Sequence, residues 1–171
     1  AILEEHQFTL ELAAEEIPVI APLVNSKGET LHHHGPFRFA LYPRRGGRPP
    51  ELDDPHHLET LGRFVGRIHA IGQVHAYKYR PTLEIGHFGV ESYQFLLEKG
   101  FIPSGLTTAY RSLAEDLIVR IQGCYARAGK IKDIRLHGDC HPGNILWTDG
   151  GPLIVDFDDA RKGPAIQDLW M

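Results

Sequence analysis

Two short segments near the end of the chain decide its fold: LHGDCHPGNILW at residues 136–147 and LIVD at residues 153–156. Between them lies TDGGP, at residues 148–152, which is rich in residues that favour turns. The apolar runs on either side of this turn predict an antiparallel hairpin. If Trp147 pairs with Leu153, Asn144 falls opposite Asp156, at a distance of about 5 Å between Cβ atoms.

This pairing predicts a metal site at the open end of the hairpin. An amide oxygen from Asn144 and a carboxylate from Asp156 meet there. Protein-bound Mg²⁺ uses oxygen ligands, typically one or two carboxylates together with substrate phosphates and water. Asp139 precedes Asn144 in a loop that contains Gly138, Pro142 and Gly143, so it can curl over the same end. We expect Asp139 to be free to act as a base.

These residues carry a resemblance to a known family. His137, Gly138, Asp139, Asn144 and Asp156 resemble the catalytic loop and the metal-binding Asp of the protein-kinase-like superfamily. The form His-Gly-Asp-x-His-x-Gly-Asn is typical of the aminoglycoside phosphotransferase and choline kinase-like group. The resemblance implies a phosphotransferase that uses ATP and Mg²⁺, with catalytic Asp139 and Asp156 and with Asn144 and Asp156 as metal ligands.

The resemblance extends over nearly all 171 residues. The apolar-periodic run at residues 2–12 resembles the helix whose Glu pairs with a phosphate-binding Lys, and Glu5 is the preferred candidate, with Glu4 as the alternative. Residues 37–43 resemble the hinge strand. The resemblance implies that the hinge backbone meets adenine at Ala40, Leu41, Tyr42 and Pro43.

Two further residues are expected to support the site. His137 is expected to orient the catalytic loop, and Asp168, within residues 163–169, resembles the Asp that braces this loop. A buried carboxylate in such a position needs hydrogen-bonding partners. We therefore expect substitution of Asp168 to loosen the loop.

The predicted fold is α+β, a protein-kinase-like arrangement of two lobes. Residues 1–43 are expected to be the remainder of an N-terminal lobe, residues 44–55 a linker rich in Gly and Pro, and residues 56–171 a helical C-terminal lobe. Long helices are predicted over residues 56–75 and 104–128, the second capped by Ser104. The Gly-rich loop and the Lys that the family places before Glu5 are not in the sequence. We therefore expect a chain truncated at both ends that has little kinase activity alone.

Net charge, apolar runs and cysteine content limit the kinds of partner and the cellular compartment that we expect for this chain. Net charge is −4, which gives no electrostatic footprint for nucleic acid. No apolar run is long enough to cross a bilayer, and two cysteines, Cys124 and Cys140, are too few for a disulfide framework. We expect a monomer in the cytoplasm that binds neither nucleic acid nor a membrane.

Other interpretations stay open at this point. The wider resemblance implies Ser and Thr side chains of proteins as acceptors, in a bacterial stress-response kinase. The local motif also permits a small hydroxylated molecule such as an aminoglycoside, choline, homoserine or a sugar. An acidic pocket would favour a cationic acceptor, and its candidates are Glu51, Asp53, Asp54, Asp158 and Asp159. A third possibility is a catalytically silent binding module that keeps the fold, against which the intact Asp139, Asn144 and Asp156 argue.

Two histidine-containing clusters suggest metal sites of another kind. Cys140 lies between His137 and His141, but no second ligand cluster with zinc spacing follows. The tract His32–His34 precedes Gly35 and Pro36 and is better explained as an exposed hairpin end.

Overall fold

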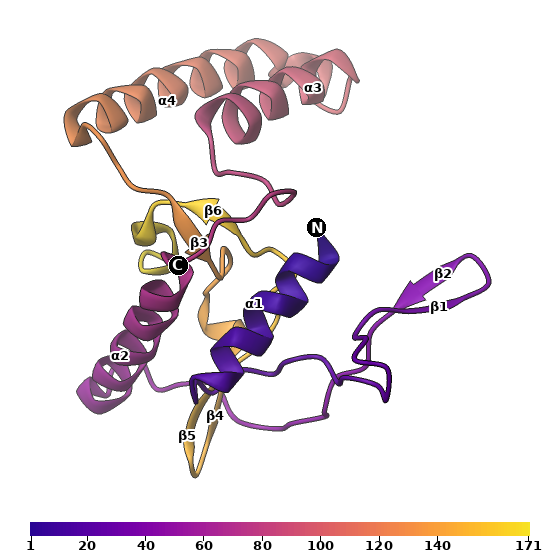
Figure 1. Cartoon of the computed structure of the whole chain (residues 1–171). Coiled ribbons are helices and arrows are strands. Elements are labelled where there is room, and N and C mark those ends of the chain that lie inside the picture. Colours follow the sequence, from indigo (N-terminus) through magenta and orange to yellow (C-terminus); the bar gives the residue numbers. More distant parts are fainter. The chain divides into compact units, whose positions relative to one another are not determined.

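The computed structural model describes all of residues 1–171 (Figure 1). The chain divides into two compact units, one made of Ala1–Pro81 with Asp133–Met171 and the other of Thr82–Lys132. The predicted linker at residues 44–55 lies inside the first unit. The division into lobes at residues 1–43 and 56–171 stays a prediction.

Helix α1, Ile2–Ala14, opens the first unit where a helix is predicted. Phe8 and Leu12 on one face are fully buried, as expected for apolar side chains four residues apart. Glu16 follows the helix with φ 55. Its amide bonds the Ala13 carbonyl at 3.1 Å, and the Ile17 amide bonds the Leu12 carbonyl at 3.0 Å. This pattern closes the helix in the left-handed conformation common at helix ends.

Helix α2, Pro55–Gly72, matches the helix predicted at residues 56–75. The Asp54 carboxylate accepts a hydrogen bond from the His56 amide and Pro55 occupies the first turn, so both start signals are local in sequence. A Cβ atom on Gly72 would lie 2.2 Å from the Arg135 carbonyl oxygen. Glycine is therefore required where the end of α2 meets the strand that carries Arg135.

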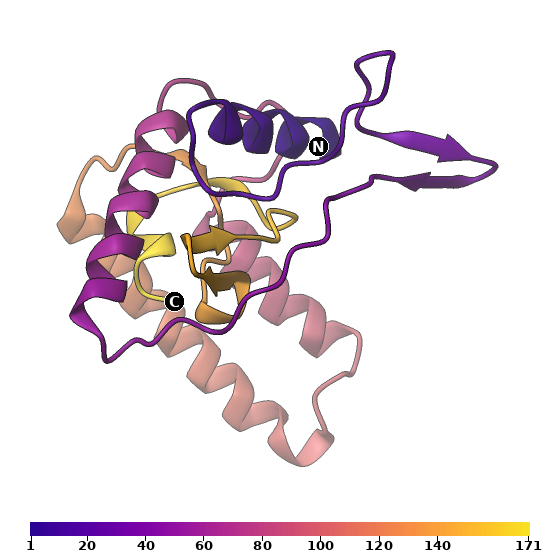
Figure 2. The same cartoon turned by 90° about the horizontal axis from the view of Figure 1, so that it is seen from below.

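Three antiparallel strand pairs complete the first unit. Strands β1, His32–His34, and β2, Phe37–Phe39, form a hairpin that projects away from α1 in Figures 1 and 2. Strand β3, Ile134–Leu136, pairs with β6, Arg161–Gly163. Strand β4, Ile145–Thr148, pairs with β5, Gly151–Ile154. The histidines of β1 are thus part of a hairpin, as expected.

The register predicted for the β4–β5 hairpin is wrong by one residue. Leu146 pairs with Leu153 and Trp147 with Pro152, which places Asn144 beside Val155 rather than Asp156. The Val155 amide donates to the Asn144 carbonyl at 3.0 Å. The cause is a tighter turn than expected, because the loop is only Asp149-Gly150, a dipeptide that favours short hairpins. The Thr148 hydroxyl closes it by donating to the Gly151 carbonyl at 2.9 Å.

The core lies between α1, α2 and the end of β5. Its buried members come from all three elements and from the segments that follow them: Phe8, Leu12, Ile17, Ile68, Tyr77, Ile154, Phe157 and Ala160. A smaller cluster joins Leu61 to Ile145 and Trp147, and the His57 ring stacks on Trp147 at 3.6 Å. Burial of α1, α2 and β5 against each other fixes the position of the segment after Ile154.

The second unit contains a π-helical stretch, Ile85–Glu91, helix α3, Ser92–Glu98, a 3-10 turn, Ser104–Leu106, and helix α4, Thr107–Ala128. None of residues 82–132 is buried. The prediction that Ser104 caps the long helix is wrong, because α4 begins three residues later and has no side-chain cap. No helix of either unit combines the length and the apolar character that crossing a bilayer requires.

Candidate active site

Two segments lie side by side because they connect the same strand pairs. Residues 137–144 run from β3 to β4, and residues 155–160 run from β5 to β6. Since β3 pairs with β6 and β4 with β5, both ends of one segment are held beside the ends of the other. Gly138, with φ +89, packs so closely that a Cβ atom there would lie 2.3 Å from the Asp159 carbonyl oxygen. A side chain at position 138 would push the segments apart.

His137 links the two segments and is fully buried. Its Nε2 donates to the Val155 carbonyl at 2.8 Å, and its Nδ1 accepts from the Asp139 amide at 3.3 Å. Burial is the main cause of the lowered pKa of His137, and a neutral ring with one donor and one acceptor nitrogen satisfies both bonds. The expected support residue thus contacts both the catalytic loop and the segment that holds Asp156.

Asp168 lies under the start of the loop, and its side chain is only 1% exposed. Its two oxygens accept hydrogen bonds from the His137 amide at 3.0 Å and the Gly138 amide at 2.8 Å. His69 from α2 donates to it as well, at 3.0 Å. The carboxylate therefore ties the loop to helix α2 through three donors.

Asp139 occupies a more open position, with 32% of its side chain exposed. The Asn144 amide donates from Nδ2 to the Asp139 carbonyl at 3.0 Å and to its Oδ2 at 3.3 Å. His141 approaches the same carboxylate at 3.5 Å. The predicted base and one predicted metal ligand are therefore in direct contact, and Asp139 keeps access to solvent.

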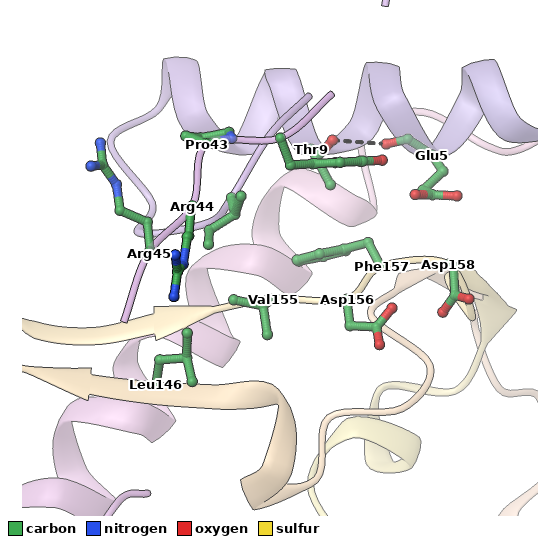
Figure 3. A pocket seen from close by; sticks show the side chains of 12 residues that line it. Glu5, Thr9, Pro43, Arg44, Arg45, Leu146, Val155, Asp156, Phe157 and Asp158 are labelled. Carbon is green, nitrogen blue, oxygen red and sulfur yellow. Dashed lines mark hydrogen bonds between the residues drawn. The ribbon is translucent and has the colours of Figure 1, made fainter. Parts of the chain in front are cut away.

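A cavity of about 520 Å³ lies between α1 and the β4–β5 hairpin (Figure 3). Residues 18–20 pair with β5, and Arg48 pairs with Trp147 of β4, so neighbouring strand-like segments flank the hairpin on both sides. The cavity has the following lining: Glu5, Thr9, Ile20, Tyr42, Pro43, Arg44, Arg45, Leu146, Val155, Asp156, Phe157 and Asp158. Figure 3 shows acidic side chains at one end, Arg44 and Arg45 at the other, and apolar Val155 between them.

The acidic end holds Asp156 and Asp158. Asp156 adopts φ 65, a left-handed conformation that is uncommon outside glycine and that often marks functional sites. A hydrogen bond with the Asp156 side chain is the main cause of the raised pKa of Asp158, followed by burial and the negative charge of Asp156. A divalent cation would relieve this crowding of carboxylates. The donor set at this end therefore fits a hard metal ion.

Helix α1 contributes two adjacent glutamates with different roles. Glu5 lines the cavity, and its Oε2 accepts from Arg80 Nη1 at 3.1 Å. Burial raises the pKa of Glu5, although Arg80 acts in the opposite direction. Glu4 instead accepts hydrogen bonds from the amides of residues 78–80. Burial acts to raise the pKa of Glu4, but these three hydrogen bonds outweigh it and lower the pKa.

The predicted hinge contributes only its last two residues to the cavity. Tyr42 and Pro43 line it, whereas Ala40 and Leu41 are not among the lining residues. Burial is the main cause that raises the pKa of Tyr42 to about 12, with the charge of Glu5 adding to it. Tyr42 stays a neutral phenol at the cavity wall.

Most of the acidic residues proposed for a cationic acceptor are not gathered at the cavity. Only Asp158 lines it. Glu51 pairs with Arg48, Asp159 with Arg161, and Asp54 caps α2. His137, Cys140 and His141 do not form a three-ligand group of the kind that could hold zinc. Burial raises the pKa of Cys140 to about 12, so its thiol stays protonated.

Comparison with known proteins defines the family. The model of the phosphotransferase enzyme family (APH) matches residues 1–171. The chain belongs to this family. Stress response kinase A of Escherichia coli (strain K12) is 45% identical over 170 residues, which are 99% of this chain and 51% of that protein. The serine/threonine protein kinase RdoA of Salmonella typhimurium is 44% identical with the same coverage. The chain spans about half the length of the curated relatives it matches.

Solved structures of phosphotransferases share its fold. Amicoumacin kinase hAmiN, in complex with AMP-PNP, Ca²⁺ and Ami, has a TM-score of 0.74 at 24% identity, covering 98% of this chain and 51% of that one. Aminoglycoside phosphotransferase APH(3'')-Id from Streptomyces rimosus, with ADP and streptomycin, has a TM-score of 0.62 at 17% identity and covers 98% and 64%. The predicted α+β, aminoglycoside phosphotransferase-like fold is confirmed.

Proposed function

We propose that this phosphotransferase-family chain forms the metal- and base-bearing part of an ATP- and Mg²⁺-dependent active site. One observation carries the proposal: Glu5, Asp156 and Asp158 converge at one end of a cavity with an apolar middle. An apolar cavity with a few convergent polar groups is typical of a cofactor site. The purine is proposed to lie along Leu146 and Val155, with the hinge backbone at residues 40–43 beside it.

The proposed chemistry assigns one task to each group. Mg²⁺ held by Asn144 and Asp156 would neutralise charge on the donor phosphates. Asp139 would accept the proton of the acceptor hydroxyl. The hydroxyl oxygen would form the new bond to the γ-phosphorus of ATP, and the bond from that phosphorus to the bridging oxygen would break, so that ADP leaves. Such base assistance contributes about 10²–10⁴-fold. His137 and Asp168 hold the loop, and Glu5 orients a phosphate-binding Lys of the whole protein.

For the whole protein we propose Ser and Thr side chains of proteins as acceptors. The names of the relatives at 45% and 44% identity, stress response kinase A and serine/threonine protein kinase RdoA, support this choice. A small hydroxylated acceptor is the alternative, and a cationic one would need acidic residues outside this cavity, because only Asp158 of the five candidates lines it. The proposal includes a cytoplasmic monomer without a membrane or nucleic-acid partner, and the net charge of −4 favours the last point.

Transfer of labelled phosphate from ATP by the whole protein tests this function. Autophosphorylation, generic protein substrates and a panel of aminoglycosides, choline, homoserine and sugars are compared, with Asp156→Asn and, as a matched control, the exposed Asp53→Asn. We expect Mg²⁺-dependent transfer to proteins, at least about 100-fold loss in Asp156→Asn and no loss in Asp53→Asn. Normal transfer by Asp156→Asn would contradict the metal assignment. Transfer to small alcohols alone would refute the protein acceptor.

A further inference from the structure

Arg80 makes an unusually complete set of contacts for a residue outside any helix or strand. Its side chain is 8% exposed. Nη1 donates to Glu5 Oε2 at 3.1 Å, Nη2 donates to the Asp158 carbonyl, and Nε donates to the Ala160 carbonyl. One guanidinium group therefore joins helix α1 to two points of the segment that follows Asp156.

The backbone around Arg80 is held as firmly as its side chain. The Glu4 carboxylate accepts from the amides of Tyr79 and Arg80, each at 3.0 Å. The Pro81 carbonyl accepts from the Lys162 amide of the β6 strand at 2.9 Å. Arg80 is thus anchored between α1 and β6, and its side chain reaches the acidic segment from a fixed point.

The side chain of Arg80 holds two points of the segment at residues 156–160. It belongs to no strand, and it begins with the left-handed Asp156. Arg80 donates to both the Asp158 and the Ala160 carbonyl. Ala160 is fully buried, so without Arg80 its carbonyl would lose its partner away from water, which is costly.

We propose that Arg80 is the positioning residue of the nucleotide–metal site. It keeps Asp156 and Asp158 at a fixed place relative to Glu5 and brings a positive charge among three carboxylates, without lining the cavity itself. The inference rests on the proposed function. It also explains why α1 carries two glutamates in a row, since Glu4 places the Arg80 backbone and Glu5 binds its side chain.

The contacts require an arginine rather than any cation. The planar guanidinium presents donors in a fixed fork, whereas the ammonium of lysine is a single point of charge on a flexible stem. The three acceptors of Arg80 come from α1 and from two separate positions on the acidic segment. Arg80→Lys keeps the charge and loses the fork, so it separates the two contributions.

The chain offers a matched control in Arg135. This second buried arginine also ties α1 to a backbone carbonyl, because it contacts Glu11 at 2.7 Å and the Ile71 carbonyl at 3.2 Å. Its guanidinium lies over the Phe8 ring, and its ion pair and its hydrogen bond go to Glu11 and to Ile71, both outside residues 156–160. Arg135→Met therefore removes, from strand β3, a buried arginine that contacts the same helix α1, and takes no hydrogen bond away from the acidic segment.

The test measures how transfer by the whole protein depends on Mg²⁺ concentration at saturating ATP, for wild type, Arg80→Met, Arg80→Lys and Arg135→Met. Thermal unfolding sets a temperature at which each is folded. We expect the Mg²⁺ concentration at half-maximal rate to rise at least about tenfold in Arg80→Met, the loss expected for a charged hydrogen bond. Arg80→Lys should show a smaller rise, and Arg135→Met none.

Two results would overturn the inference. One is an unchanged Mg²⁺ dependence in Arg80→Met, or in Arg80→Lys where the first variant does not fold. The other is an equal shift in Arg80→Met and Arg135→Met, which would indicate a general loss of stability. Asp156→Asn in the same assay keeps this failure distinct from failure of the proposed function. It stays inactive if only the role of Arg80 is wrong, whereas its normal transfer would contradict the proposed metal site.

Discussion

Asp139 lies within the loop at residues 137–144 and Asp168 binds the start of this loop, yet the two carboxylates differ in nearly every physical respect. The Asp168 side chain is 1% exposed, and three donors from His69, His137 and Gly138 satisfy it. The Asp139 side chain is 32% exposed, and its carboxylate meets only Asn144 and His141. A buried carboxylate whose oxygens already accept several hydrogen bonds is suited to hold the loop backbone in place. A solvent-exposed carboxylate can instead receive a proton. Substituting each should therefore change a different observable.

The largest expected effect is on catalysis. Asp139→Asn removes the proposed base but keeps the size of the side chain, so we expect transfer to fall by about 10²–10⁴-fold. The free energy of unfolding should change by less than about 0.5 kcal/mol, because the position is partly exposed. Initial rates of phosphate transfer, beside chemical denaturation of the whole protein, measure the two quantities.

His141→Asn is the matched control for Asp139→Asn. His141 Nδ1 accepts from the Gly143 amide at 2.9 Å, and an Asn side chain can take over this bond across two residues. Only the approach to Asp139 at 3.5 Å is lost, and exposed ion pairs contribute at most about 1 kcal/mol. A loss as large as that of Asp139→Asn would mean that the histidine shares the base role.

The second effect is on stability. Asp168→Asn places an amide NH₂ where one carboxylate oxygen now accepts hydrogen bonds, so a buried donor faces other donors. We expect a loss of about 3 kcal/mol in the free energy of unfolding, measured by denaturant titration. Activity measured where the variant is folded should retain its Mg²⁺ dependence. Wild-type stability with a 100-fold loss of rate would reverse the roles assigned to the two aspartates.

Local patterns predicted the elements, and contacts distant in sequence escaped prediction. Helices α1 and α2 follow from apolar spacing and from the Asp54 and Pro55 start signals. The hairpin was predicted with a five-residue turn at residues 148–152. The structure instead has a two-residue turn, Asp149-Gly150, and the register changes with the length of the turn. A one-residue shift moves Asn144 from Asp156 to Val155.

In the candidate site, too, residues within one motif were predicted, whereas a contact between residues distant in sequence was not. The loop motif predicted Asp139, Asn144 and Asp156 as site residues because their spacing is a local property of the sequence. Arg80 lies in a segment without periodicity, and its partners Glu5 and the Asp158 carbonyl are separated from it by 75 and 78 residues. Two of its three acceptors are backbone carbonyls, which no residue pattern marks. The only feature of the sequence that points to a buried arginine here is the pair of adjacent glutamates on helix α1, Glu4 and Glu5.

The smallest expected effect is a pH dependence that tests how His137 connects the two aspartates. Burial lowers the pKa of His137, so below its unfolded pKa of about 6.5 the unfolded chain binds a proton that the folded one does not. Stability should therefore fall as pH falls. One such group contributes at most about 1.4 kcal/mol per pH unit.

His137→Gln isolates this contribution, because glutamine can donate to the Val155 carbonyl and does not titrate. His6, whose pKa is also lowered by burial, is common to both proteins and cancels in the difference. Between pH 6.5 and 5.5, the stability difference between wild type and variant should shrink by up to about 1.4 kcal/mol, measured by urea unfolding at each pH. Parallel pH profiles would mean that a charged His137 is tolerated between the Val155 carbonyl and the Asp139 amide, and the neutral-ring link between the loop and the Asp156 segment would be wrong.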